Sequence, residues 1–101
     1  MTNQKYILGK KHELIETDLM TWAKWFEDIN NWRVANDFIG KVQISTVFLG
    51  LDHNFSMRGE PLLFETMIFG GKKDNEQWRW HTWKEAEVGH KKILKKLKSP
   101  D

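Results

Sequence analysis

The 101 residues include no cysteine, so a disulfide framework and thiolate chemistry are both excluded. No apolar run approaches the roughly 18 residues that a membrane-spanning helix needs. The first residues, MTNQKYILGKK, lack the apolar core of a signal peptide, so we expect none. These absences favour a soluble protein of a reducing cytoplasm, with no membrane partner.

Signatures of common enzyme classes are missing too. The sequence contains no HExxH, P-loop, GxSxG or GxGxxG motif, and no motif in it indicates a particular cofactor. No metal site is expected, because the spacing of the residues that could share a metal matches no metal motif; these are Asp52, His53, Glu65 and His90. No linker or repeat interrupts the chain, so a single domain over residues 1–101 is predicted.

The net charge of +2 is an average over two unlike parts. Residues 91–101 hold five lysines and one acid, a balance of +4, so the other ninety residues sum to −2. This basic helix end and tail has two interpretations. The lysines are a solvated helix face, where cations also favour the helix C-terminus, or they attract phosphate. The charge is no signature of a DNA-binding domain as a whole.

Hydrophobic periodicity predicts an α+β fold: a small antiparallel meander of three to five strands with two helices packed on it, most simply on one face. Asp18 is predicted to cap the first helix, and Thr82 with Glu85 forms a capping box before the second. The predicted strands are residues 5–8, 33–36 (at a sheet edge), 41–49, 61–69 and 76–81, and the predicted helices are residues 19–30 and 83–98.

Three places could carry ligand chemistry. Asp52 and His53 follow an apolar strand, where a rigid sheet can present them for binding. The simpler alternative is that Asp52 caps the turn and His53 is a surface loop residue. Glu65 lies mid-strand beside apolar residues, so it either pairs with Arg33 or a histidine, or lines a pocket. His90 lies on the apolar stripe of the second helix, as a satisfied core residue or as a ligand.

Aromatic residues are abundant, with six tryptophans among thirteen. Trp78 and Trp80 share a predicted strand face, and Trp83 opens the following helix. Exposed indoles can stack on nucleotide bases. Alternatively, they cover the helix or the sheet edge.

Four segments resemble a family of short, functionally unassigned proteins of tailed bacteriophages and prophages: LMTWAKWFE, STVFLGLDHNF, PLLFETMIFGG and TWKEAEVGH. The likeness spans about residues 18–90. This chain differs in its lysine tail and in Trp80, where the family has tyrosine. The resemblance implies a phage setting in the host cytoplasm, and it marks a set of polar positions: Arg33, Ser45, Thr46, Asp52, His53, Glu65, Thr66, Thr82 and His90.

Three functions stay open. The first is a phage-encoded accessory binding protein, of counter-defence type, that captures a nucleotide-like ligand or a host factor and pairs with itself as a homo-oligomer. Trp80 or Trp83 would stack, Arg33 and lysines would meet phosphate, and Asp52 or Glu65 would take a hydroxyl or amine. The second is a small hydrolase with His53 or His90 as base and Asp52 or Glu65 as an orienting or a metal-bound carboxylate. Ser45 and Thr46 lie close by in sequence. The third is a protein-interaction or structural module.

Overall fold

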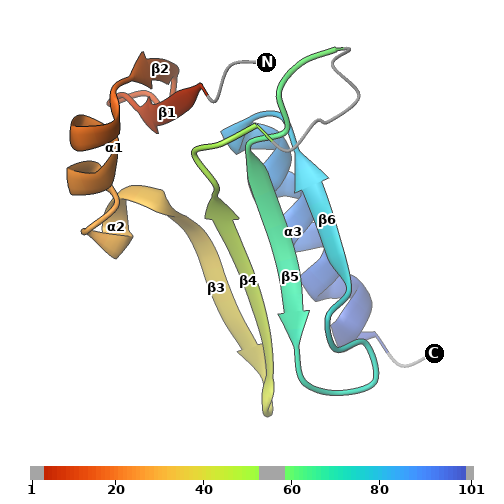
Figure 1. The fold of residues 1–101 in the computed structure, drawn as a ribbon. Helices are drawn as coiled ribbons and strands as arrows, with labels where there is room; N and C mark the ends of the chain where they lie inside the picture. The colour runs from red at the N-terminus through yellow and green to blue at the C-terminus, as the bar shows by residue number, and fades with distance from the viewer. Residues whose placement is uncertain (1–3, 53–58, 100–101) are drawn as a thin grey trace.

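The computed structural model describes residues 4–52 and 59–99. Figure 1 shows two separate antiparallel sheets, one of two strands and one of four, joined by short helices and followed by one long helix. The elements in chain order are β1 (Lys5–Leu8), β2 (Leu14–Thr17), α1 (Leu19–Trp25), α2 (Ile29–Trp32), β3 (Arg33–Ile39), β4 (Val42–Phe48), β5 (Phe64–Phe69), β6 (Gln77–Trp80) and α3 (Trp83–Lys98).

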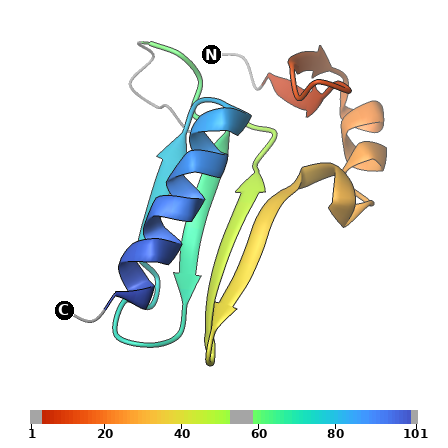
Figure 2. The same ribbon diagram turned by 180° about the vertical axis from the view of Figure 1, so that it is seen from behind.

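The four-stranded sheet is a simple meander in the order β3-β4-β5-β6. α3 runs along one face of it and contacts all four strands, as the views from the two sides show (Figures 1 and 2). The α+β class and the antiparallel meander are thus confirmed. The helix count differs from the prediction, because the described chain holds three helices rather than two.

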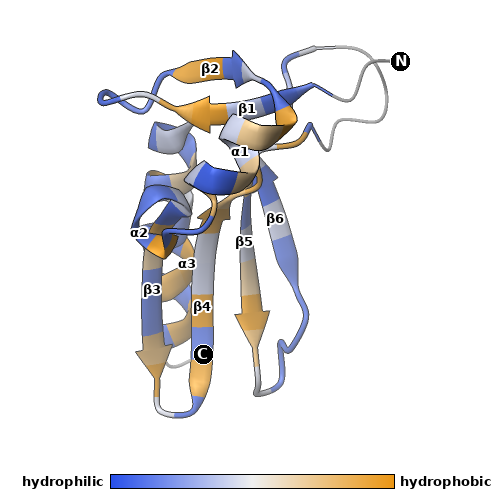
Figure 3. Ribbon diagram, turned by 60° about the vertical axis from the view of Figure 1, so that its left-hand side comes forward, coloured by the Kyte–Doolittle hydropathy of each residue, from blue (hydrophilic) through white to orange (hydrophobic). Residues whose placement is uncertain are grey.

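Strand alternation determines which side chains meet α3. In β4, Ile44, Thr46 and Phe48 are buried, whereas the residues between them are half-buried. β5 repeats the pattern with Phe64, Thr66 and Ile68. Figure 3 shows the hydrophobic residues of β4 interrupted by hydrophilic ones. The sheet therefore has a buried face under α3 and a second face that α3 does not cover.

α3 has the bounds that its sequence predicts, because its cap is encoded locally. The Glu85 amide donates to the Thr82 hydroxyl at 3.0 Å. The Glu85 carboxylate accepts from the backbone amide of His81 at 2.9 Å, one residue before the amide that a capping box predicts. Among the described residues, no helix is both long enough and apolar enough to cross a lipid bilayer.

The predicted single helix over residues 19–30 is wrong, because the chain breaks between Trp25 and Ile29 into α1 and α2. Asp28 starts α2 by accepting from the Asn30 amide at 2.9 Å. Side chains of α2 satisfy the backbone carbonyls left open at the end of α1. The side-chain amide of Asn31 donates to the Trp25 carbonyl at 2.8 Å, and the Trp32 indole donates to the Phe26 carbonyl at 3.0 Å.

Two strands extend beyond the prediction. β2 was not expected at all, and it pairs only with β1 in the two-stranded sheet. The predicted edge strand over residues 33–36 continues to Ile39, because β3 pairs with β4 along almost its whole length. Both differences arise from pairing between segments, to which a short local pattern is a weak guide.

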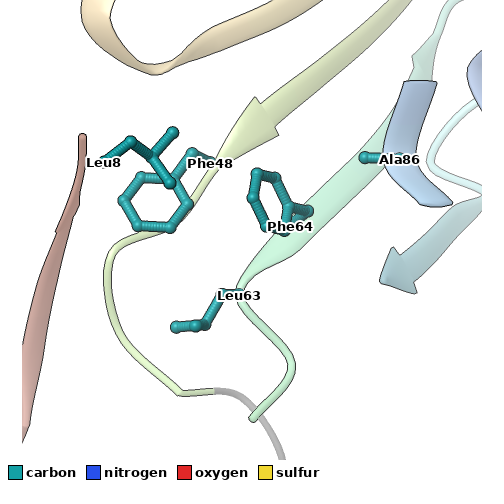
Figure 4. Packing of buried hydrophobic residues seen from close by; sticks show 5 residues of the cluster. All are labelled: Leu8, Phe48, Leu63, Phe64 and Ala86. Atoms are coloured by element: carbon teal, nitrogen blue, oxygen red, sulfur yellow. The ribbon is translucent and has the colours of Figure 1, made fainter. Parts of the chain in front are cut away.

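An aromatic core joins the N-terminal elements to the sheet. Phe48 stacks on Phe26 with ring centres 6.0 Å apart and lies 5.1 Å from Phe64; Figure 4 shows Phe48 and Phe64 with Leu8, Leu63 and Ala86. After β4, Gly50 adopts a φ of +75°, and a Cβ there would lie 2.6 Å from the Phe26 ring. Glycine is therefore required where the STVFLGLDHNF segment leaves the sheet.

Candidate functional site

Three polar side chains are buried among the described residues, and all three meet at the centre of the sheet under α3: Thr46, Thr66 and His90. The Thr46 and Thr66 hydroxyls lie 2.5 Å apart across the β4–β5 pair. His90 reaches down from α3, and its Nδ1 lies 2.7 Å from the Thr46 hydroxyl. Buried polar groups of this kind are stable only when each one is paired.

Both ends of this cluster continue into neighbouring strands. The His90 Nε2 lies 2.7 Å from the Asp37 carboxylate of β3, which is 47% exposed. At the other end, the Trp80 indole of β6 donates to the Thr66 hydroxyl at 3.0 Å. A chain of five side chains thus crosses the whole sheet and ends at solvent: Trp80, Thr66, Thr46, His90 and Asp37.

One assignment of the hydrogens satisfies every donor along this chain. The indole can only donate, so Thr66 accepts from Trp80. Each hydroxyl can then pass its own hydrogen forward, from Thr66 to Thr46 and from Thr46 to the unprotonated Nδ1 of His90. His90 then carries its hydrogen on Nε2 and donates it to the Asp37 carboxylate. In this arrangement every donor in the chain has an acceptor.

Gly89 leaves space for the Trp80 end of the hydrogen-bonded chain. A Cβ at that position would lie 2.4 Å from the Trp80 ring. The indole, held by its bond to Thr66, therefore packs directly against the α3 backbone. The glycine costs roughly 1 kcal/mol in helix propensity, and close helix–sheet packing is what that cost permits here.

The hydrogen-bonded side chains of Asp37, His90 and Thr46 form a carboxylate–imidazole–hydroxyl series of the kind that many hydrolases use. However, the Thr46 and Thr66 hydroxyls are fully buried, and His90 is 2% exposed. A substrate cannot reach them while α3 covers the sheet. The arrangement therefore fits a structural clamp between α3 and the four strands better than a catalytic group.

Other predicted site residues lie on the opposite face of the sheet. Glu65 accepts from the Arg79 guanidinium at 3.1 Å, rather than from Arg33 or a histidine. Cross-strand register places Arg33 in the same row, and Ser45 lies on this face too. Convergence of Glu65 with His90 is not found, because residues of opposite strand parity face opposite sides of a sheet.

Asp52 closes the base of the loop that follows β4. Its carboxylate accepts from the Leu62 amide at 2.9 Å, which ties the end of β4 to the approach to β5. Burial raises the pKa of the nearby Tyr6 phenol, and the Glu16 and Asp52 carboxylates add to that rise. His53 lies outside the described residues.

Thr82 and Trp83 act at the start of α3. Thr82 caps the helix, and the Trp83 ring stacks on His12 with ring centres 3.6 Å apart and planes 7° apart. His12 belongs to the β1–β2 turn, so this contact docks the hairpin onto α3. Of the predicted ligand residues, Thr46, Thr66, Trp80 and His90 are brought together, whereas Arg33, Ser45, Asp52, Glu65, Thr82 and Trp83 lie elsewhere.

Lysines gather at the opposite end of the molecule from the β1–β2 hairpin. The β3–β4 turn, the β5–β6 turn and the C-terminal half of α3 all lie at this end, as both views show (Figures 1 and 2). We call their exposed lysines, together, the basic end: Lys41, Lys72, Lys73, Lys91, Lys92, Lys95, Lys96 and Lys98. A hollow on α3 is lined by Lys91, Leu94, Lys95, Lys98 and Ser99.

The separation of charge is strong within the described residues. These eight lysines are accompanied by two acids, Asp74 and Glu76, of which Glu76 lies 3.9 Å from Lys73. The rest of the described chain has seven basic and eleven acidic residues. The two turns and the C-terminal half of α3 therefore carry about +6, and the rest of the described chain, which includes Asp37 beside His90, carries about −4, although the whole chain is nearly neutral.

Sequence reasoning missed Asp37 and the part of the basic end in the turns. In the sequence, Asp37 is an acidic residue like many others in strands. Only the pairing of β3 and the packing of α3 bring it to His90. Lys41 and Lys72 are more than thirty residues apart in sequence, and both are distant from residues 91–98. Within the described residues, no three histidine or acidic side chains are placed to hold a metal together.

Comparison with known proteins identifies no relative: no family model, no curated protein and no solved structure matches the chain. The function has to be inferred from the described side chains and their chemistry.

Proposed function

We propose that this protein is a binding module that captures a phosphate-bearing, nucleotide-like ligand on its basic end. The observation that supports this proposal is the gathering of eight exposed lysines from two turns and one helix at one end of the fold. Such a concentrated patch attracts polyanions even when the net charge is small. In the phage setting implied by the sequence resemblance, the protein would act in the host cytoplasm as an accessory, counter-defence factor.

The hollow on α3 supports a phosphate contact in particular. Lys91, Lys95 and Lys98 follow one another at spacings of four and three residues, so they lie on one helical stripe. Each ammonium can donate up to three hydrogen bonds to phosphate oxygens. Self-association into a homo-oligomer is part of the same proposal.

The hydrolase alternative receives less support, because the only carboxylate–imidazole–hydroxyl order among the described residues is buried under α3.

Binding of a fluorescein-labelled oligothymidylate of twelve nucleotides, followed by anisotropy, tests the proposal. We expect binding that weakens with salt. The variant K91E/K95E/K98E should bind at least ten-fold more weakly at low salt, and for three phosphate contacts the slope of log affinity against log salt should fall by about 2.

The matched control is K10E/K11E/K84E, which changes the net charge equally but at the other end of the molecule, and it should retain binding. The proposal is wrong if the wild type fails to bind at low salt, or if both triple variants bind equally well.

A further inference from the structure

The face of the four-stranded sheet away from α3 carries a row of two aromatic rings. Phe38 of β3 pairs with Gln43 of β4, and Gln43 pairs with Phe69 of β5. Their strand neighbours Asp37, Ile44 and Ile68 lie on the α3 side. Alternation therefore directs the row to the opposite face. We call Phe38, Gln43 and Phe69 the phenylalanine row.

Both rings are exposed, Phe38 to 61% and Phe69 to 42%. Two strand spacings separate them, roughly 10 Å, and each is held by a paired strand. Gln43 lies between them, and its side-chain amide Nε2 donates to the side-chain oxygen Oδ1 of Asn36 at 2.8 Å. That bond does not use the Gln43 oxygen or the Asn36 amide hydrogens, which are an acceptor and donors of the kind that base edges require.

Lysines flank the row on the same end of the molecule. Lys41 lies in the turn between Phe38 and Gln43, and Lys72 and Lys73 follow Phe69 through Gly70 and Gly71. Aromatic rings next to ammonium groups match a strand whose bases stack while its phosphates are neutralised. A duplex hides its base faces, so it could use only the lysines.

We propose that the phenylalanine row is a stacking surface for unpaired bases, which makes the ligand of the basic end single-stranded nucleic acid. This inference rests on the proposed function and adds the class of ligand. Phe38 and Phe69 take bases, Gln43 and Asn36 meet a base edge, and the turn lysines Lys41, Lys72 and Lys73 take the adjoining phosphates. The lysines of α3 lie on the other face of the sheet, so a strand reaches them by passing round the end of the sheet. An acidic protein would meet the lysines, but it offers no bases for the two rings to stack on.

The test compares F38A/F69A with the wild type on two labelled probes, the oligothymidylate of twelve nucleotides and a duplex of twelve base pairs. We expect the double variant to bind the single strand more weakly by roughly five- to a hundred-fold for each of the two stacking rings lost, and to bind the duplex as the wild type does. F38W/F69W should retain single-strand binding. Both variants change exposed side chains, and unchanged thermal melting would show that they fold.

The matched control is L19A/M20A, which removes two exposed apolar side chains of α1 and should leave both affinities unchanged. If F38A/F69A binds the single strand as tightly as the wild type while K91E/K95E/K98E binds clearly more weakly, the stacking inference is wrong and the proposed function stands. Equal competition by polyglutamate and by the oligothymidylate would also overturn the inference. If the wild type binds neither probe, the proposed function itself fails.

Discussion

At the scale of single residues, the buried hydrogen-bonded chain is the most demanding feature of the protein. Thr46 occupies its middle, where its hydroxyl is hydrogen-bonded to both the Thr66 hydroxyl and the His90 Nδ1. All three side chains are buried, so water cannot replace a missing partner. The single oxygen of the Thr46 hydroxyl therefore determines whether two other buried groups have a hydrogen-bond partner.

Thr46→Val keeps the shape of the side chain and removes the hydroxyl. We expect it to lower the free energy of unfolding by about 2–4 kcal/mol, because the Thr66 hydroxyl and the His90 Nδ1 both lose a buried partner. Urea denaturation followed by tryptophan fluorescence measures this. Thr46→Ser keeps the hydroxyl, and its loss should stay near 1 kcal/mol for the missing methyl group. A Thr46→Val variant as stable as the wild type would contradict the assigned bonds.

At the scale of elements, helix caps explain where the helical segments start. Asp18 accepts from the Thr21 amide at 2.8 Å and from the Thr21 hydroxyl at 3.2 Å. These bonds lower the pKa of the Asp18 carboxyl, the backbone bond most of all. The folded state therefore favours the ionised carboxylate, at a helix end that also attracts negative charge.

Asp18→Asn retains a capping side chain and removes only the charge. Because the pKa of Asp18 is lower in the folded state, its charge stabilises the fold above its ordinary pKa of about 3.9, and this contribution is lost as the pH falls through the lowered value. We expect the wild type to melt at a higher temperature than the variant at pH 7, and the two to converge near pH 2. A difference that is constant between pH 7 and pH 2 would contradict this account.

At the scale of the whole molecule, the separation of charge is the main property. The basic end and the remainder of the described chain carry opposite net charges. Charges within the basic end reinforce one another over about one Debye length, roughly 10 Å at 0.1 M salt. A charged partner surface therefore interacts with the local charge of the basic end, and not with the net charge of the whole protein.

Cation-exchange chromatography at pH 8 tests this property without any ligand. K41E/K72E removes two lysines from the basic end, whereas K10E/K11E removes two from the β1–β2 turn, and both lower the net charge equally. We expect K41E/K72E to elute at clearly lower salt than K10E/K11E. Elution of both variants at the same salt concentration would mean that the retention depends only on net charge.

The elements that could be predicted well are those whose cause is local. α3 follows from its cap and its apolar stripe, and β4 and β5 follow from strict alternation. β2 could not be predicted, since its four residues are mostly exposed and become a strand only by pairing with β1. The break between α1 and α2 also depends on side chains, those of Asn31 and Trp32, that cap open carbonyls six residues earlier in the chain.

For the candidate sites, the sequence indicated individual candidate residues better than it indicated which of them lie together in the fold. His90 on an apolar stripe signalled either a core histidine or a ligand, and the structure places it in a buried chain. Its partner Asp37 could not be identified, because strand pairing and helix packing bring together residues 53 positions apart.

The sequence by itself determined the amphipathic elements, the absence of cysteine and the surplus of lysine near the end of the chain. Periodicity and capping act over one turn of helix or one pleat of strand, so local order is enough to encode them. Only the tertiary structure decided that two turns join α3 in one basic end, and that Phe38 and Phe69 share one row. These groupings depend on register and packing between distant segments, which no local pattern specifies.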